Sequence, residues 1–139
     1  MNRRTKESVY NKLYHFFTED KNCIYCGELG STVDHIPALD WVSCLGSEYF
    51  TKRKIEFLLA SCCWECNDTL SDKDFFTVND RKDYLLRTYM YKYEGLLNSP
   101  DWDEEDINEL SPNLQLITRN KISLKRIVNE RLLTLETWI

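Results

Sequence analysis

Cys23-Ile-Tyr-Cys26 is the first of two Cys-x-x-Cys units in this chain, and Cys63-Trp-Glu-Cys66 is the second. Four thiolates in two such pairs can close a tetrahedral site around one ion. We therefore predict that these four cysteines bind zinc, rather than acting as a redox dithiol. Because the protein would fill all four coordination positions, the predicted zinc is structural and leaves no place for a reactive water.

The two remaining cysteines lie outside this pattern. Cys62 directly precedes the second pair, so a Cys62-x3-Cys66 pairing is an alternative, but Cys63 with Cys66 has the more usual spacing. We expect Cys62 and Cys44 to be small buried apolar residues.

Length and composition are those of one globular domain. The chain has 139 residues, of which 42% are hydrophobic and 29% are charged, and it should bury roughly two-thirds of its unfolded surface. No apolar run approaches the ~18 residues of a membrane span. The charged N-terminus leads into no apolar signal-peptide core. We therefore expect a cytoplasmic protein, without membrane association, whose cysteines are reduced.

Negative charge is concentrated in one segment. The formal net charge is −5, and residues 101–109 hold six acidic side chains and no basic one. The rest of the chain is close to neutral, which allows phosphate binding without predicting it. We interpret the segment as a solvated helix face, with docking of a basic protein partner as the alternative.

Apolar periodicity predicts an α+β fold in the first half of the chain. We expect a helix over 4–19, strands over 31–36 and 55–60, and a helix over 64–75. Pro37 should end the first of these strands. Residues 21–75 would then form the zinc module.

The second half is expected to be helical. Thr77 should cap a helix that runs to about Asn98, and Ser99-Pro100 and Ser111-Pro112 should each begin another. The last helix has an apolar face formed by Ile117, Leu124, Val128, Leu132, Leu135 and Ile139. We predict a single domain over 1–139 in which this extension, 76–139, packs on the module, with a two-part architecture as the alternative.

The module resembles the HNH family of endonucleases, also called ββα-metal nucleases. The resemblance covers about residues 21–75 and depends on Cys23-x2-Cys26, Asp34-His35-Ile36-Pro37 and Leu58-Leu59 running into Cys63-x2-Cys66-Asn67. It implies a treble-clef zinc core. Farther along, Leu70-Ser71-Asp72-Lys73 and Pro100-Asp101-Trp102 resemble a bacterial and phage group of HNH-like proteins.

The resemblance also implies an activity, the metal-dependent hydrolysis of phosphodiester bonds in DNA. His35 would act as general base, while Asp34 and Asn67 would hold a catalytic Mg²⁺ or Mn²⁺. Asp72, on the same predicted helix as Asn67, is a further candidate ligand. The candidate nucleic-acid contacts are the basic residues Lys52, Arg53, Lys54 and Lys73.

One element of the family pattern is missing. The family usually has an Asn between the Asp-His pair and the second cysteine pair, where it orients the catalytic histidine, and residues 36–62 contain none. Glu56 or a backbone carbonyl would have to orient His35 instead. The alternative function is therefore a catalytically degenerate, zinc-stabilised interaction protein of phage or mobile-element type that binds a protein or nucleic-acid partner.

Overall fold

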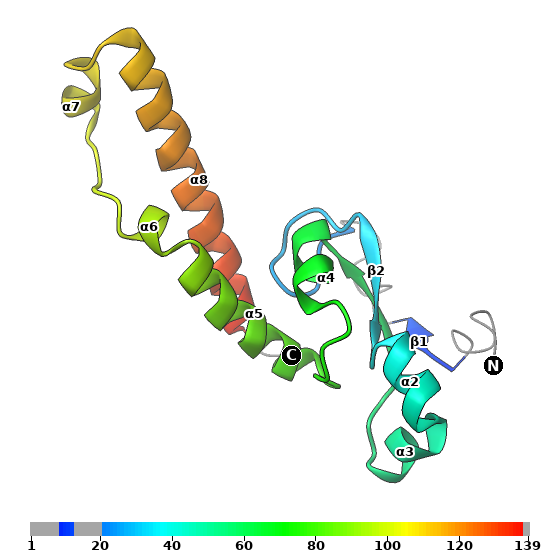
Figure 1. The fold of residues 1–139 in the computed structure, drawn as a ribbon. Coiled ribbons are helices and arrows are strands. Elements are labelled where there is room, and N and C mark those ends of the chain that lie inside the picture. Colours follow the sequence, from blue (N-terminus) through cyan, green and yellow to red (C-terminus); the bar gives the residue numbers. More distant parts are fainter. Residues whose placement is uncertain (1–8, 13–20, 138–139) are drawn as a thin grey trace.

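The computed structural model describes residues 9–12 and 21–137, and the α+β prediction is confirmed (Figure 1). A small sheet has the order β1-β3-β2. β2 (Thr32–Ile36) is antiparallel to β3 (Leu58–Cys62), and β1 (Asn11–Lys12) is parallel to β3. The sheet therefore brings the start of the described chain and two later segments together.

Seven helices lie in the described residues, and they form two groups (Figure 1). Three short helices accompany the sheet: α2 (Leu39–Leu45), α3 (Ser47–Lys52) and α4 (Trp64–Leu70). The others form an arm in which α8 runs back alongside the three before it: α5 (Val78–Lys92), α6 (Glu94–Leu97), α7 (Glu104–Asn108) and α8 (Pro112–Glu136). None of these helices combines the length and apolar character that a membrane crossing requires.

The strand predicted at 31–36 is confirmed as β2, and the one predicted at 55–60 is shifted to β3. The register pairs Asp34 with Ala60 and His35 with Leu59. Because successive side chains leave a strand on opposite faces, Asp34 and His35 project from opposite faces of the sheet. Residues 55–57 precede the paired segment, and Ile55 and Phe57 join an aromatic cluster.

Two hydrophobic clusters cover the sheet. The aromatic cluster centres on Tyr10, Val42 and Phe50, and Phe50 meets Phe57 and Phe76 edge to face. The larger cluster contains the four cysteines of the two Cys-x-x-Cys units. The other members are apolar residues of the module and the arm: Ile24, Tyr25, Ile36, Ala60, Cys62, Leu70, Val78, Leu85, Tyr89 and Leu135. The base of the arm therefore shares a core with the module.

Two predictions for the first half are wrong in part. The helix predicted at 64–75 stops at Leu70, because Ser71 has a positive φ of 41° that a right-handed helix does not tolerate. The helix predicted at 4–19 is contradicted at Asn11–Lys12, which pairs with β3; its residues 4–8 and 13–20 lie outside the described residues. Helices α2 and α3 were not predicted.

Two of the three predicted helix starts are confirmed, and the third is wrong. Thr77 caps α5 by accepting a hydrogen bond from the Asp80 N–H at 3.1 Å, although α5 ends at Lys92 rather than near Asn98. Ser111 is the N-cap of α8, with Pro112 in its first turn. Ser99-Pro100 begins no helix: α7 starts at Glu104, and the Asp103 carboxylate caps it instead.

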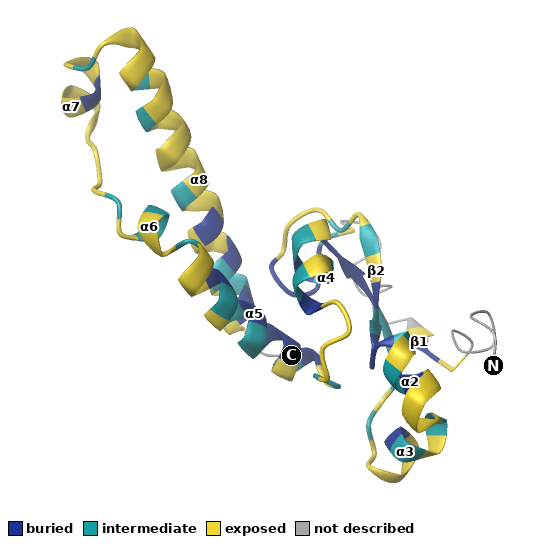
Figure 2. Cartoon of the chain, in the orientation of Figure 1, coloured by how far each residue is buried: buried dark blue, intermediate teal, exposed yellow. Residues whose placement is uncertain are grey.

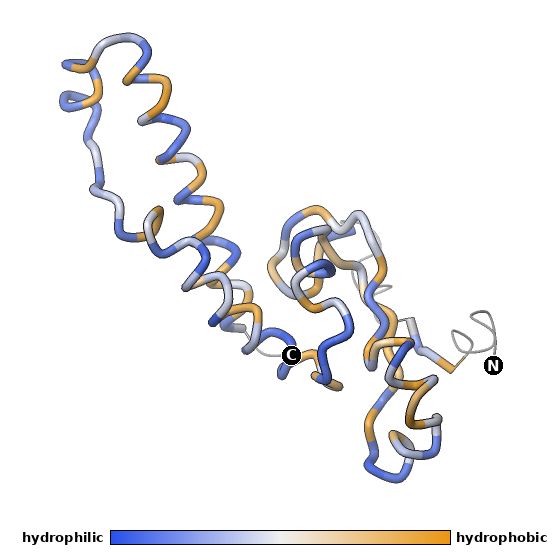
Figure 3. Tube along the Cα trace, in the orientation of Figure 1, coloured by the Kyte–Doolittle hydropathy of each residue, from blue (hydrophilic) through white to orange (hydrophobic). Residues whose placement is uncertain are grey.

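The apolar face predicted for α8 is buried only toward its C-terminal end. Val128 and Leu135 are buried, whereas Ile117 is 52% exposed and Leu124 is 53% exposed. In Figure 2 the N-terminal half of α8 is mostly exposed, and hydrophobic segments recur there in Figure 3. The reason is that α5 covers only part of this longer helix. Ile139 lies outside the described residues.

Candidate metal centre and the adjoining pocket

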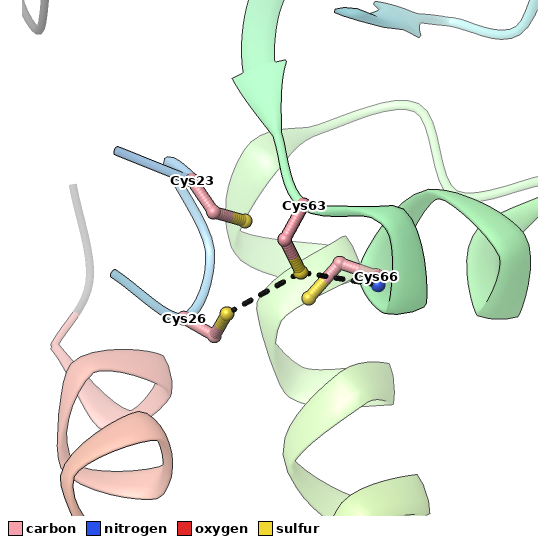
Figure 4. A group of neighbouring side chains, drawn as sticks. All are labelled: Cys23, Cys26, Cys63 and Cys66. Atoms are coloured by element: carbon pink, nitrogen blue, oxygen red, sulfur yellow. Dashed lines mark hydrogen bonds between the residues drawn. The ribbon is translucent and has the colours of Figure 1, made fainter. Parts of the chain in front are cut away.

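Cys23, Cys26, Cys63 and Cys66 form one buried group, with all four sulfurs within 4.8 Å of one another (Figure 4). Cys26 Sγ and Cys63 Sγ are 3.6 Å apart, close to the sulfur separation of about 3.8 Å that four Zn–S bonds in a tetrahedron require. Within residues 9–12 and 21–137, no other group of His, Cys, Asp or Glu side chains meets this proximity. The four sulfurs could therefore hold a zinc ion.

Local backbone geometry presents the two cysteine pairs. In the first pair the Gly27 N–H donates to the Cys23 carbonyl at 3.0 Å, and Gly27 has a φ of 82°, which favours glycine. In the second pair Cys63 is the N-cap of α4, and its sulfur accepts from the Cys66 N–H at 3.4 Å. The second pair thus lies at a helix N-terminus, where the peptide dipoles favour thiolates.

Mutual contact shifts the pKa values of these thiols. A hydrogen bond from Cys23 is the largest influence on Cys26 and lowers its pKa to about 7. Cys26 raises the pKa of Cys23, but the other neighbouring thiols outweigh it and lower that pKa to about 3. Cys23 is also the largest cause that raises the pKa of Cys66. The group therefore shares negative charge, and a bound cation would displace the remaining protons.

The two other cysteines differ from each other. Cys62 is fully buried, as predicted, and its thiol donates to the Cys63 carbonyl at 3.4 Å. The prediction for Cys44 is wrong, because this residue lies exposed on α2.

A pocket of about 230 Å³ adjoins β2 and α4. It contains all three residues that the family resemblance selects, although they are distant in sequence: Asp34, His35 and Asn67. Two further acids, Asp40 and Asp72, also line it. The remaining lining residues are Val33, Ala38, Leu39 and Ser71. Residues from β2 and α4 thus line one surface hollow, although the side chains of Asp34 and His35 leave opposite faces of β2.

Asp34 already has a cationic partner. Arg81 of α5 is fully buried, and its Nη1 donates to the Asp34 carboxylate at 3.0 Å. The Tyr25 hydroxyl donates to the same carboxylate oxygen. Burial raises the pKa of Asp34, while Arg81 and Tyr25 oppose that rise. The carboxylate is therefore held in a buried ion pair.

His35 and Asn67 are also held by neighbours. The His35 ring meets the Tyr10 ring edge to face, with centroids 5.2 Å apart, and Arg81 Nη2 donates to the His35 carbonyl at 3.5 Å. The Asn67 amide donates to Thr32 Oγ1 at 3.0 Å, which fixes its orientation on α4. Glu56, proposed to orient His35, lines a different pocket.

The predicted nucleic-acid contacts are dispersed. Arg53 and Lys54 line the pocket that contains Glu56, and the Arg53 guanidinium lies 3.6 Å from the Tyr49 ring centroid. Lys52 ends α3 and is exposed. Lys73 is exposed and follows Asp72 at the edge of the first pocket. Of these four basic residues, only Lys73 directly follows a residue that lines the pocket of Asp34, His35 and Asn67.

Sequence reasoning missed Arg81, although a signal for it exists. The buried side of α5 follows helical spacing through Val78, Arg81, Lys82, Leu85 and Tyr89. A basic residue inside an apolar stripe must find a buried partner, because an unpaired buried charge is strongly unfavourable. This pattern could have indicated that α5 supplies a counterion to the module.

Comparison with known proteins adds no family to this description: no protein-family model, curated protein or solved structure matches the chain significantly.

Proposed function

We propose that this chain is a metal-dependent endonuclease of the HNH type that hydrolyses phosphodiester bonds in DNA. The observation that carries the proposal is the pocket that Asp34, His35 and Asn67 line together. These residues come from β2 and from the first turn of α4, which lie far apart along the chain. Their presence at one hollow is what the family resemblance requires.

The order of elements supports the same proposal. A Cys-x-x-Cys turn precedes the antiparallel pair β2–β3, and the second cysteine pair opens α4 directly after β3. We interpret this arrangement as a treble-clef core with structural zinc at the four cysteines. Its role would be to fix α4, and with it Asn67, against β2.

In the proposed chemistry, the His35 imidazole takes a proton from the attacking water. Asp34 and Asn67 offer the oxygen ligands for Mg²⁺ or Mn²⁺, and Asp72 lines the same pocket as a further donor. When bound, such an ion supplies positive charge opposite the scissile phosphate and the leaving oxygen. Lys73 is the basic residue best placed in sequence to meet a neighbouring phosphate.

The test is a plasmid-nicking assay with Mg²⁺ or Mn²⁺ on the wild type and on His35→Ala. Removing a general base should slow cleavage by about 10²–10⁴-fold. Zinc content and thermal unfolding are measured for both proteins, since His35 also packs against Tyr10. Cleavage at equal rates by two folded, zinc-loaded proteins would contradict the proposal.

The Asp34–Arg81 ion pair favours a second function. A guanidinium 3.0 Å from the carboxylate competes with any divalent ion for Asp34. A zinc-stabilised protein that binds a partner without catalysis would retain this buried pair as a structural contact. Its partner would be a basic protein that meets the acidic segment 101–109.

Two acids of the segment 101–109 already form ion pairs within the chain, so the test of this second function should change only the other acids. Asp101 and Glu104 already pair with Lys125 and Arg119 of α8. We would therefore neutralise Glu105, Asp106 and Glu109, which leaves those pairs and the Asp103 cap intact. A cross-linked partner captured by the wild type and lost by the neutralised variant would support this function, and retained capture would contradict it.

A further inference from the structure

The four-cysteine group poses an electrostatic problem. Four thiolates around one divalent zinc carry a net charge of about −2. All four cysteines are buried, and a buried net charge is unfavourable unless other charges or hydrogen-bond donors compensate it. The groups packed around the cysteines therefore decide whether the metal can be bound tightly.

Arg131, from α8, is the first such group. Its side chain is 10% exposed, and Nη1 pairs with Glu65 at 2.6 Å. Its Nε and Nη2 atoms are buried, and neither has a hydrogen-bond partner among residues 9–12 and 21–137. Burial lowers the pKa of Arg131, but the neighbouring Cys26 and Glu65 outweigh it and hold that pKa above its ordinary value. The guanidinium thus has two buried donors that no described residue uses, and its charge interacts with Cys26.

Tyr89, from α5, is the second group that packs against these cysteines. Its hydroxyl donates to Cys66 Sγ at 3.1 Å, and the Arg131 guanidinium lies over its ring, 4.7 Å from the centroid. Tyr89 therefore contacts a metal-site sulfur and holds Arg131 in position.

Lys82, also from α5, binds the C-terminal end of α8. Its ammonium donates to the Thr134 carbonyl at 2.9 Å and to the Thr137 carbonyl at 2.6 Å. Its pKa is lowered by burial, against an opposing effect of Cys23 and Cys26. One cation thus lies near the first cysteine pair and fixes the C-terminal end of α8.

The turn of the first cysteine pair also touches α8 directly. A Cβ atom added at Gly27 would lie 3.3 Å from Thr134 Oγ1, so this turn and α8 are already close. Figure 4 shows the ends of α5 and α8 beside the four cysteines.

We propose that α5 and α8 form the outer shell of the metal centre, in which Arg131 compensates the charge of the thiolates and donates toward Cys26. The inference rests on metal binding by the four cysteines and is independent of nuclease activity. It implies that metal binding and the docking of α8 strengthen each other equally, because coupling between two equilibria is reciprocal.

The experiment measures zinc affinity by competition with a chromophoric chelator for the full chain and four variants. Arg131→Gln should bind zinc about 10–100-fold more weakly, the usual effect of removing an outer-shell partner of a metal ligand. Tyr89→Phe, which keeps the ring and removes only the donor, should weaken binding by about 10-fold. Both proteins are checked for folding by circular dichroism in saturating zinc.

Two further variants serve as controls. Glu65→Gln breaks the ion pair with Arg131 but keeps the guanidinium and the Tyr89 ring on which it lies. Arg119→Gln removes a distant cation that pairs with Glu104. Both should retain zinc affinity within about threefold of the wild type, well inside the effect of an outer-shell loss. A loss in Glu65→Gln as large as in Arg131→Gln would assign the effect to the ion pair and overturn the inference.

Hydrogen exchange gives the reciprocal readout. Zinc should slow amide exchange in the C-terminal half of α8 in the wild type, and should slow it much less in Arg131→Gln. Unchanged exchange on zinc addition, or equal zinc affinity in wild type and both outer-shell variants, would overturn the inference. Absence of zinc binding by the wild type would instead remove the metal site itself.

Discussion

Replacing Cys66 with serine is expected to abolish stoichiometric zinc binding and to unfold the module around the sheet. Cys66 is fully buried within the larger hydrophobic cluster. Structural zinc contributes about 10–16 kcal/mol in zinc-finger peptides, whereas a whole domain is stable by only about 5–15 kcal/mol. Loss of one of four ligands therefore removes a large share of the stability, and chelation of the wild-type metal should have the same effect.

The measurements are metal content by elemental analysis and thermal unfolding in reducing buffer. Cys62→Ala is the matched control, because Cys62 is equally buried and adjacent in sequence but lies outside the four-sulfur group. It should keep one zinc per chain and lose about 1 kcal/mol, an ordinary core effect. Full zinc content and an unchanged melting temperature in Cys66→Ser would contradict the assignment of these four ligands.

The grouping of these cysteines was predictable because metal chemistry constrains local spacing. Each pair is brought together within one turn, so two Cys-x-x-Cys units specify the site before the fold is known. The start of α8 was predictable for a similar reason, since Ser111-Pro112 is a local signal for a helix N-terminus. Local chemistry also accounts for the end of β2 at Ile36, directly before Pro37.

Features that depend on distant partners were not predictable. The Asp34–Arg81 pair joins residues 47 positions apart, and nothing in the sequence near Asp34 indicates its counterion. The same holds for the exposure of Ile117 and Leu124, since their apolar spacing predicts a buried face, whereas only the packing of α5 decides how much of α8 is covered. The short strand at Asn11–Lys12 likewise exists because β3 offers a free edge to it.

The second large effect is expected at this Asp34–Arg81 pair. Arg81→Met should destabilise the protein by about 3–5 kcal/mol, because it leaves a buried carboxylate without its cation. Asp34→Asn should cost a similar amount by leaving the guanidinium unpaired. The double variant should be more stable than the sum of the two single losses predicts, since it removes both buried charges. Urea unfolding of the four proteins in saturating zinc measures this cycle, and additive losses would contradict a direct interaction.

The same proteins distinguish the two proposed functions through Mn²⁺ binding at the pocket. If Asp34 is a ligand of the catalytic ion, Arg81→Met should bind Mn²⁺ more tightly than the wild type, because the competing guanidinium has gone. Asp34→Asn should lose both Mn²⁺ binding and cleavage under conditions where it remains folded. Asp40 lines the same pocket and forms no ion pair with another described residue, so Asp40→Asn controls for the general loss of negative charge. Unchanged Mn²⁺ affinity in both Asp34→Asn and Arg81→Met would mean that the Asp34 carboxylate pairs with Arg81 and binds no Mn²⁺. That result would favour the non-catalytic binding protein over the nuclease.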